Sequence, residues 1–300
     1  MTISSLPPPP PRPPHSLPPP PPPVVAGRSG SGWKDTDRPP SVPYPETSRW
    51  GLGDAMIATL IYFASSVVLI VLVVLVFDAD PLDSAWFPIS LIVPQLLQLA
   101  FVVWTARSRG SGLSVDFGFA FAWKDIGIGV ILFFVGIVAA AVIGLTMTAA
   151  GVDPPTSAVA ELTEEAVDGP DADGGILPGD VDALPDLDDE DDSDGSGITV
   201  WIVVVAILAA TAVPFIEELG YRGLWYSAMV KRGHSEWWAI AMSSFVFAIV
   251  HLEPARTPII FALGMVLGWG RMLTNRIGAS IIAHAIINGL SFIALLVYLA

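Results

Sequence analysis

The chain has 300 residues, of which 53% are hydrophobic and 14% charged, and its mean hydropathy is +0.63. This apolar share exceeds that of an ordinary soluble domain and indicates a polytopic protein of the lipid bilayer. The formal charge of −15 comes almost entirely from residues 151–197, which hold 16 of the 29 acidic residues and no Lys or Arg, so it indicates no nucleic-acid partner. The absence of cysteine excludes disulfides, thiolate metal sites and a cysteine nucleophile.

Residues 1–49 are predicted to form a disordered tail. The segment has proline runs at 7–11 and 18–23, followed by a stretch rich in Gly, Ser and Arg. Such runs favour the extended polyproline II conformation, and the segment lacks the short apolar core of a signal peptide. We expect a solvated spacer; the alternative is a proline-rich ligand for an aromatic-lined groove of a partner protein.

Membrane spans are predicted from apolar segments of about 20 residues. We expect an all-α transmembrane bundle of about seven spans, with accessory helices in residues 50–150 and a core in residues 198–300. The fourth segment is too long for a simple span, and Pro214 should kink it just before two glutamates. Gly264 and Gly268 form a small-x-x-x-small pair that allows close helix packing. The segments are 53–77, 87–106, 125–149, 198–230, 236–252, 257–272 and 278–299.

The basic residues predict the orientation. With this number of spans they fall into four groups on one side of the membrane, and the acidic segment falls on the other side. Because Lys and Arg concentrate in cytoplasmic loops, we expect an integral plasma-membrane protein with a cytoplasmic N-terminus. The groups are Arg28, Lys34, Arg38 and Arg49; Arg107, Arg109 and Lys124; Lys231 and Arg232; and Arg271 and Arg276.

The acidic segment at residues 151–197 superficially resembles a calcium-binding loop. If Gly195 is taken as the sixth position of an EF-hand loop, Glu190 is the first and Trp201 the twelfth, where a bidentate glutamate is needed. The pattern therefore does not match an EF-hand. We expect a disordered, solvated loop, with a cation or partner site as the alternative.

The polar residues predicted at membrane depth are few and closely spaced. Ionised groups there cost at least ~2.5–3.5 kcal/mol each on insertion scales, so they indicate a function by default. Glu218 and Arg222 stand at i and i+4, on one helical face, where they can form an ion pair. Glu217 lies about 100° around the same helix and has Tyr221 at i+4, so it has no cation at that spacing.

The polar set also contains His251, His284 and Asn288, with Gln95 and Gln98 in the second predicted span. Glu217 and His251 lie about equally far in sequence from the basic turn that joins their helices, so we expect them at the same depth. A carboxylate and an imidazole at one depth can share a proton, or hold and deprotonate a water molecule. His284 and Asn288, at i and i+4 on the last helix, provide donors suited to a developing oxyanion.

Each of these residues also has a purely structural interpretation. Glu218 and Arg222 could be an ion pair that fixes helix geometry. His251 alone could be a packing or proton-relay residue, and Asn288 alone an interhelical hydrogen bond. A surplus glutamate together with two histidines and an asparagine, all at membrane depth, favours a catalytic site.

Three short motifs on successive apolar helices carry these residues: Glu217-Glu218 with Arg222, Phe247 with His251, and His284 with Asn288. Their patterns are E-E-x-x-x-R, F-x-x-x-H and H-x-x-x-N. In this order they resemble the CAAX prenyl endopeptidase and bacteriocin-processing (Abi) family of intramembrane proteases. Each motif is weak alone, whereas the ordered set is a strong match.

The resemblance implies an all-helical membrane endopeptidase that cleaves a peptide or protein substrate with activated water. The family name implies prenylated C-terminal substrates, although nothing in the sequence encodes prenyl recognition. On this analogy Glu217 acts with His251 as general base, and His284 with Asn288 stabilises the oxyanion. Glu218, Arg222 and Phe247 would be supporting residues.

The family has been described both as metal-dependent and as metal-free. If a zinc ion is needed, its ligands would be Glu217, His251 and His284. The chain has no H-E-x-x-H helix, and Asn288 is a poor first choice as a zinc ligand. We therefore expect no tightly bound metal.

Two other classes of function remain as alternatives. A non-catalytic membrane protein, such as a peptide-binding or bacteriocin-immunity factor, could use the same polar pocket. A proton-coupled transporter could use membrane Glu and His residues as a relay. The transporter is the less favoured of the two, because the predicted spans show no obvious repeat of two similar halves.

Overall fold

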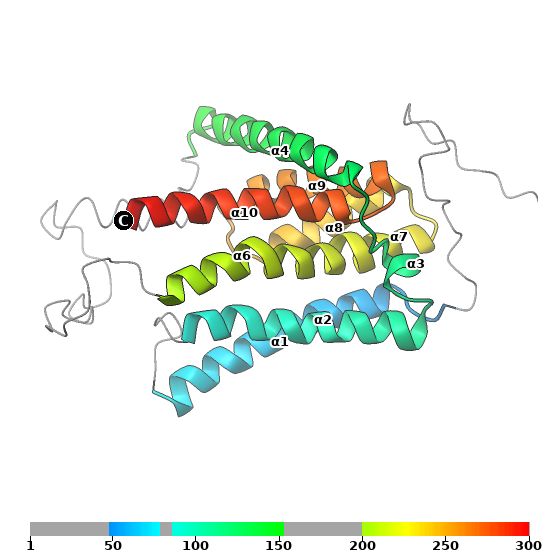
Figure 1. Cartoon of the computed structure of the whole chain (residues 1–300), viewed down its shortest axis with the longest axis horizontal. Coiled ribbons are helices and arrows are strands. Elements are labelled where there is room, and N and C mark those ends of the chain that lie inside the picture. The colour runs from blue at the N-terminus through cyan, green and yellow to red at the C-terminus, as the bar shows by residue number, and fades with distance from the viewer. Residues whose placement is uncertain (1–47, 79–85, 153–199, 300) are drawn as a thin grey trace, which may run out of the picture.

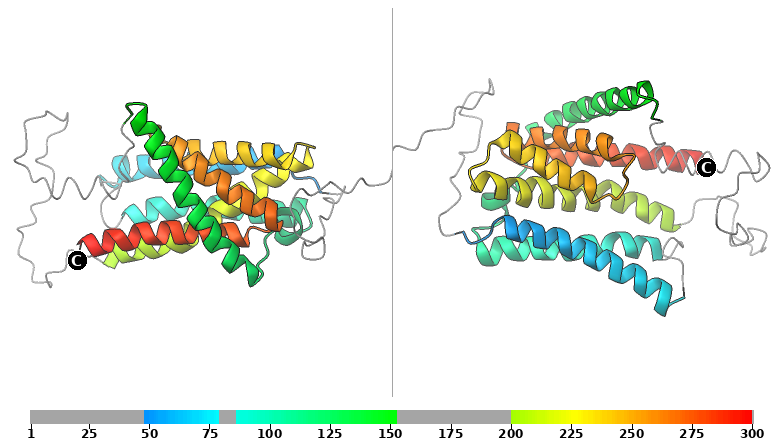
Figure 2. Two further views of the ribbon diagram at one scale, coloured as in Figure 1. Left: turned by 90° about the horizontal axis from the view of Figure 1, so that it is seen from above. Right: turned by 180° about the vertical axis from the view of Figure 1, so that it is seen from behind.

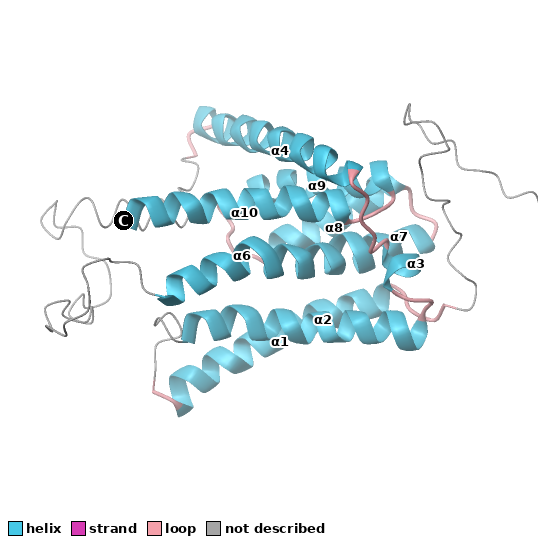
Figure 3. Ribbon diagram, viewed as in Figure 1, coloured by secondary structure: helices cyan, strands magenta, loops and turns pink. Residues whose placement is uncertain are grey.

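The computed structural model describes residues 48–78, 86–152 and 200–299, and within these ranges every regular element is helical (Figure 1, Figure 3). The all-α fold predicted from the apolar segments is therefore confirmed. The predicted tail and acidic loop lie almost wholly outside the described residues, so both stay predictions.

Each predicted apolar segment coincides with a helix, and the structure adds the short helix α3. By length and composition, 5 helices of the described chain are able to cross a membrane, namely α1, α2, α4, α9 and the continuous segment Val203–Lys231. Helix α8 and the described part of α10, Gly278–Ile293, are apolar but shorter. The elements are α1 (Leu52–Val76), α2 (Trp86–Arg109), α3 (Leu113–Phe117), α4 (Lys124–Ala149), α6 (Val200–Glu218), η3 (Leu219–Trp225), α7 (Tyr226–Lys231), α8 (Glu236–Ile249), α9 (Thr257–Thr274) and α10 (Gly278–Leu299).

Helices α1 and α4 form the two outer faces of the bundle, and α6 lies between α2 and α10 (Figure 1, Figure 2). In an apolar stretch of 18 residues, only 6% of α1 and 17% of α4 is buried inside the bundle. In the segment Val203–Lys231 the corresponding share is 50%. The outer helices therefore expose large apolar side chains such as Leu75 and Leu145. An apolar surface of this extent suits a lipid environment and supports an integral membrane protein.

Helix α1 begins at the end of the bundle where α2 and α7 end (Figure 1), and basic residues lie at these helix ends. Arg109 forms an ion pair with Asp54 there. Lys231 donates to the carbonyl of Trp50 at 2.6 Å, and Arg276 pairs with Asp125 at 2.8 Å. Arg109, Lys231 and Arg276, which belong to the predicted basic groups, thus share one end, while the side of the membrane on which this end lies stays a prediction.

The predicted glycine pair lies at the contact between α9 and α8. A Cβ atom on Gly264 would come within 2.9 Å of the Ser244 Cβ, and one on Gly268 within 2.7 Å of the Ile240 Cγ2. Both separations are below ordinary van der Waals contact, so the two helices approach as closely as they do only because these side chains are absent.

Replacing Gly268 by alanine should destabilise the fold by about 1–3 kcal/mol, because the added methyl group forces α8 and α9 apart. Thermal unfolding of the purified protein in detergent measures the change. Gly127→Ala is the matched control, since a Cβ there has nothing within 4 Å and alanine is the better helix former. Equal unfolding temperatures for the two variants would contradict close packing at Gly268.

The long fourth segment changes helix type instead of ending. Pro214 stays inside α6, which continues to Glu218 and then becomes the π-helix η3. Two glycines make the wider turn compatible with close neighbours: a Cβ on Gly223 would lie 3.1 Å from the Phe117 Cβ, and one on Gly220 would lie 3.5 Å from the Gln98 Nε2. The π-helix was not predicted and lies after the two glutamates, in a buried segment, whereas the kink at Pro214 stays a prediction. Short π-helical turns are frequent at functional sites.

Candidate active site

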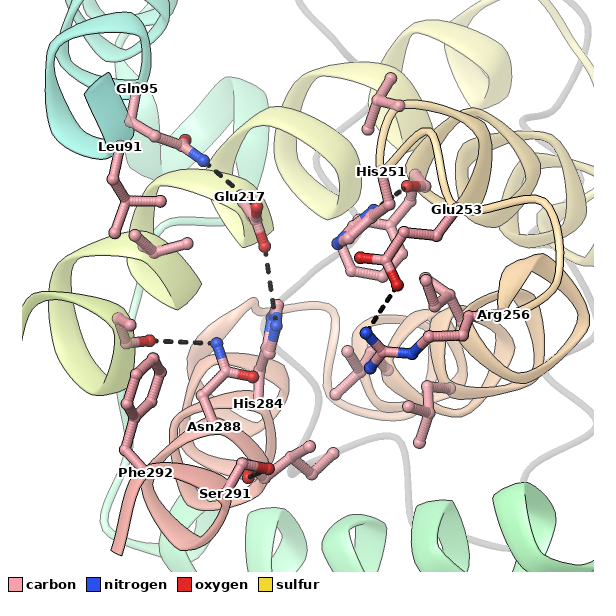
Figure 4. A pocket seen from close by; sticks show the side chains of 18 of the residues that line it. Leu91, Gln95, Glu217, His251, Glu253, Arg256, His284, Asn288, Ser291 and Phe292 are labelled. Carbon is pink, nitrogen blue, oxygen red and sulfur yellow. Dashed lines mark hydrogen bonds and ion pairs between the residues drawn. The ribbon is translucent and has the colours of Figure 1, made fainter. Parts of the chain in front are cut away.

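A cavity of about 440 Å³ lies among α1, α2, α6, α8, α9 and α10, and every residue predicted to be catalytic lines it. Figure 4 shows Glu217, His251, His284 and Asn288 around this space, with Gln95 beside Glu217. The wall is otherwise mainly apolar, formed by residues such as Phe247. The structure therefore brings together residues that lie as far as 71 positions apart, as Glu217 and Asn288 do.

Behind the cavity wall, Glu218 and Arg222 form the ion pair that their spacing predicts. The Arg222 Nη1 lies 2.9 Å from the Glu218 Oε1, and both side chains are fully buried. The Arg222 Nη2 also donates to the carbonyl of Gly264 at 3.1 Å, and the guanidinium lies 4.3 Å from the centre of the Phe247 ring. This cation is thus held by a carboxylate, a backbone carbonyl and an aromatic face.

Glu218 has a second partner that the sequence did not predict. The His284 Nδ1 lies 2.9 Å from the same Oε1 that binds Arg222. An ionised carboxylate can only accept, so the Nδ1 carries the proton and donates it. A hydrogen bond at one ring nitrogen determines the role of the other, and here it directs the His284 Nε2 toward the cavity.

Glu217 has one hydrogen bond, through its Oε1, while its Oε2 faces a histidine. Its Oε1 accepts a hydrogen bond of 3.2 Å from the Gln95 Nε2, and its Oε2 lies 3.6 Å from the His284 Nε2. The prediction that Glu217 has no cation at i+4 is confirmed, but its nearest basic partner is His284 from α10. No bond between the described residues joins Glu217 to His251, which lies across the cavity (Figure 4).

His251 is oriented by the end of α8. Its Nδ1 donates to the carbonyl of Phe247 at 2.6 Å, one of the last carbonyls of a helix that ends at Ile249 and so needs a partner outside the helix. The Nε2 is then the nitrogen with a free lone pair. The F-x-x-x-H spacing is thus the spacing at which an imidazole can cap its own helix and keep a basic nitrogen available.

The ring of Phe247 contacts three polar side chains of the site. Its ring meets the His251 ring at a centroid distance of 4.7 Å and the His284 ring at 5.7 Å, both edge-on. The same ring lies under the Arg222 guanidinium. A phenylalanine at this position therefore sets the relative placement of both histidines.

Asn288 connects α10 to α6. Its Nδ2 donates to the carbonyl of Ala209 at 3.0 Å, so the interhelical bond considered from the sequence is present. A carboxamide has two N–H donors, and one remains for a group inside the cavity. The structural and chemical interpretations of Asn288 are therefore compatible.

The same residues do not fit a zinc site as they are arranged. Within the described ranges, no group of three His, Asp or Glu side chains is placed to hold a metal ion. His284 donates from its Nδ1 to Glu218 and His251 donates from its Nδ1 to the Phe247 carbonyl. Three protein ligands converging on one point are the minimum of a catalytic zinc site, and Glu217, His251 and His284 do not form that set here.

Comparison with known proteins gives one match. No curated protein and no solved structure matches the chain. Residues 199–290 match the family model described as Type II CAAX prenyl endopeptidase Rce1-like, a match that supports a CAAX-type intramembrane endopeptidase and hence a protease. The segment that carries all three motifs is thus similar to the Rce1-like CAAX endopeptidases, the family that the motifs resemble.

Proposed function

We propose that this protein hydrolyses a peptide bond within the membrane, with Glu217 and His251 activating water and with His284 and Asn288 stabilising the oxyanion. The observation that carries the proposal is that these side chains, from α6, α10 and the end of α8, line one cavity. The Rce1-like match supports the class of reaction.

The first step is attack by water on the carbonyl carbon of the scissile bond. A water molecule in the cavity between Glu217 and His251 would give one proton to this pair as its oxygen bonds to carbon. The Glu217 carboxylate is the first acceptor, and its Oε1 is held by the Gln95 amide. The His251 Nε2, with Nδ1 bound to a carbonyl, is the second acceptor on the opposite wall.

The geometry favours His284 as a donor. Its two ring nitrogens lie 2.9 Å and 3.6 Å from carboxylate oxygens of Glu218 and Glu217. Ionised carboxylates can only accept hydrogen bonds.

The carbonyl oxygen of the substrate becomes negative as the tetrahedral intermediate forms. The His284 Nε2 and the second N–H of Asn288 both reach the cavity and would donate to that oxygen. When the C–N bond breaks, the proton taken from water passes to the leaving nitrogen. The products are a carboxylate and an amine, which balances the addition of one water molecule.

The test is hydrolysis by the purified full chain in lipid vesicles. The probes are two quenched-fluorescence peptides of one sequence, with the cysteine of a C-terminal CAAX tetrapeptide either prenylated or free. We expect cleavage of the prenylated probe, with both product masses found by mass spectrometry. Measurable binding of the probe without hydrolysis would overturn the proposal in favour of a peptide-binding protein.

A further inference from the structure

A residue outside the segment that matches the family model contacts the proposed general base. Gln95 belongs to α2, whereas the match covers residues 199–290. Its side chain lines the cavity and is only 2% exposed. Its Nε2 lies 3.2 Å from the Glu217 Oε1 (Figure 4).

The chemistry of the two groups determines how the amide is oriented. An ionised carboxylate has no hydrogen to donate, so it is the N–H of Gln95 that faces Glu217. Hydrogen bonds to a charged acceptor are about twice as strong as those between neutral groups. Gln95 therefore holds one oxygen of Glu217, while His284 faces the other.

This orientation leaves the other end of the amide without a partner. The Gln95 Oε1 is buried and makes no hydrogen bond within the described residues. An unsatisfied buried acceptor costs about 1–3 kcal/mol, so an apolar side chain would serve the fold at least as well at this position. The hydrogen bond from the Gln95 Nε2 to Glu217 compensates for the unpaired Oε1.

We propose that Gln95 is a positioning residue for Glu217, so that the site is completed by a helix preceding the matched segment. This inference rests on the proposed function. With an oxygen held by α2 and the other facing α10, the carboxylate plane of Glu217 is set relative to the water that it activates. Small misplacements of a catalytic group lower the rate steeply, which is the effect to be measured.

The experiment compares Gln95→Leu with Gln98→Leu in the full chain, using the prenylated probe in vesicles. Gln98 is the matched control, because it is the same residue type on the same helix, is also 2% exposed, and lies against Gly220 instead of Glu217. We expect Gln95→Leu to lower kcat roughly 10- to 100-fold, the loss of a hydrogen bond to a charged group. KM and the unfolding temperature should stay close to those of the original protein, and Gln98→Leu should keep its kcat.

A second variant keeps the inference testable if Gln95→Leu does not fold. Gln95→Glu preserves size and removes the N–H donor, and it should lower kcat in the same way. Unchanged kcat in both variants, with Glu217→Gln inactive, would overturn the positioning role alone. Equal losses for Gln95→Leu and Gln98→Leu would also overturn it, as a general packing effect. Activity of Glu217→Gln would instead overturn the proposed function.

Discussion

Replacing Glu217 by glutamine should reduce hydrolysis of the prenylated probe by about 10²–10⁴-fold, the usual contribution of a general base. Glutamine keeps the size of the side chain and can still meet Gln95, but it has no lone pair basic enough to take the proton of water. The rate in vesicles, measured as initial product formation per protein molecule, checks the prediction. The unfolding temperature should change little, because Glu217 lies at the cavity and is only partly buried.

Glu253→Gln is the matched control for this variant. Glu253 is another carboxylate that lines the same cavity, but it pairs with Arg256 at 2.6 Å on the loop between α8 and α9. Its replacement should leave kcat within a factor of about two, since no proton transfer is assigned to it. Undiminished turnover by Glu217→Gln would remove the proposed base, and equal losses in both variants would indicate that the cavity needs negative charge in general.

Replacing Glu218 by glutamine should destabilise the protein by about 3–5 kcal/mol, because it leaves Arg222 fully buried without its counter-charge. Chemical unfolding in detergent, followed by tryptophan fluorescence, measures the loss. Activity should fall as well, since the His284 Nδ1 loses the carboxylate that orients it. Activity assays at low temperature separate the loss of stability from the loss of catalysis. The variant is then mostly folded, so the remaining loss of activity comes from the site itself.

Two comparisons sharpen this prediction. The double variant Glu218→Gln with Arg222→Met removes both charges and should recover part of the lost stability, because no unpaired charge is then left buried. Glu253→Gln breaks a pair whose side chains are 41% and 32% exposed, and such pairs contribute at most about 1 kcal/mol. If Glu218→Gln lowers the free energy of unfolding no more than Glu253→Gln does, the buried ion pair does not stabilise the protein more than an exposed one.

Local spacing predicted those features of the site that lie within one helix. The i, i+4 spacing of Glu218 and Arg222 was sufficient to predict their ion pair, which is present at 2.9 Å. Apolar runs of sufficient length likewise predicted where each helix lies, because the bilayer requires them. Both inferences depend only on helix geometry, which varies little from one protein to another.

Contacts between helices could not be predicted in this way. The bond from Gln95 to Glu217 joins residues 122 positions apart, and that from His284 to Glu218 joins residues 66 apart. They depend on how α2 and α10 pack against α6, for which a single sequence has no local signal. Counting residues from the connecting turn predicts the depth of Glu217 and His251 but not the direction in which each side chain points, and the two residues lie across one cavity from each other.

The π-helix could not be predicted from the sequence either. Hydropathy does not distinguish an α-helical from a π-helical turn, since it reports the side chains and not the backbone hydrogen-bond pattern. The sequence does contain the pair Gly220 and Gly223, where Gln98 and Phe117 approach the backbone. Two glycines in a buried helix were the available signal, and their meaning depends on neighbours that only the tertiary structure provides.

The π-helix also sets the rotational phase of α7. Each i→i+5 bond of η3 encloses one more residue than an α-helical bond, so α7 is turned by about 100° relative to a straight continuation of α6. This turn points Lys231 at the start of α1, where its amine meets the carbonyls of Ser48 and Trp50. Deleting or inserting one residue between Leu219 and Trp225 would therefore remove none of the proposed catalytic residues. It would, however, turn Lys231 away from the carbonyls of Ser48 and Trp50.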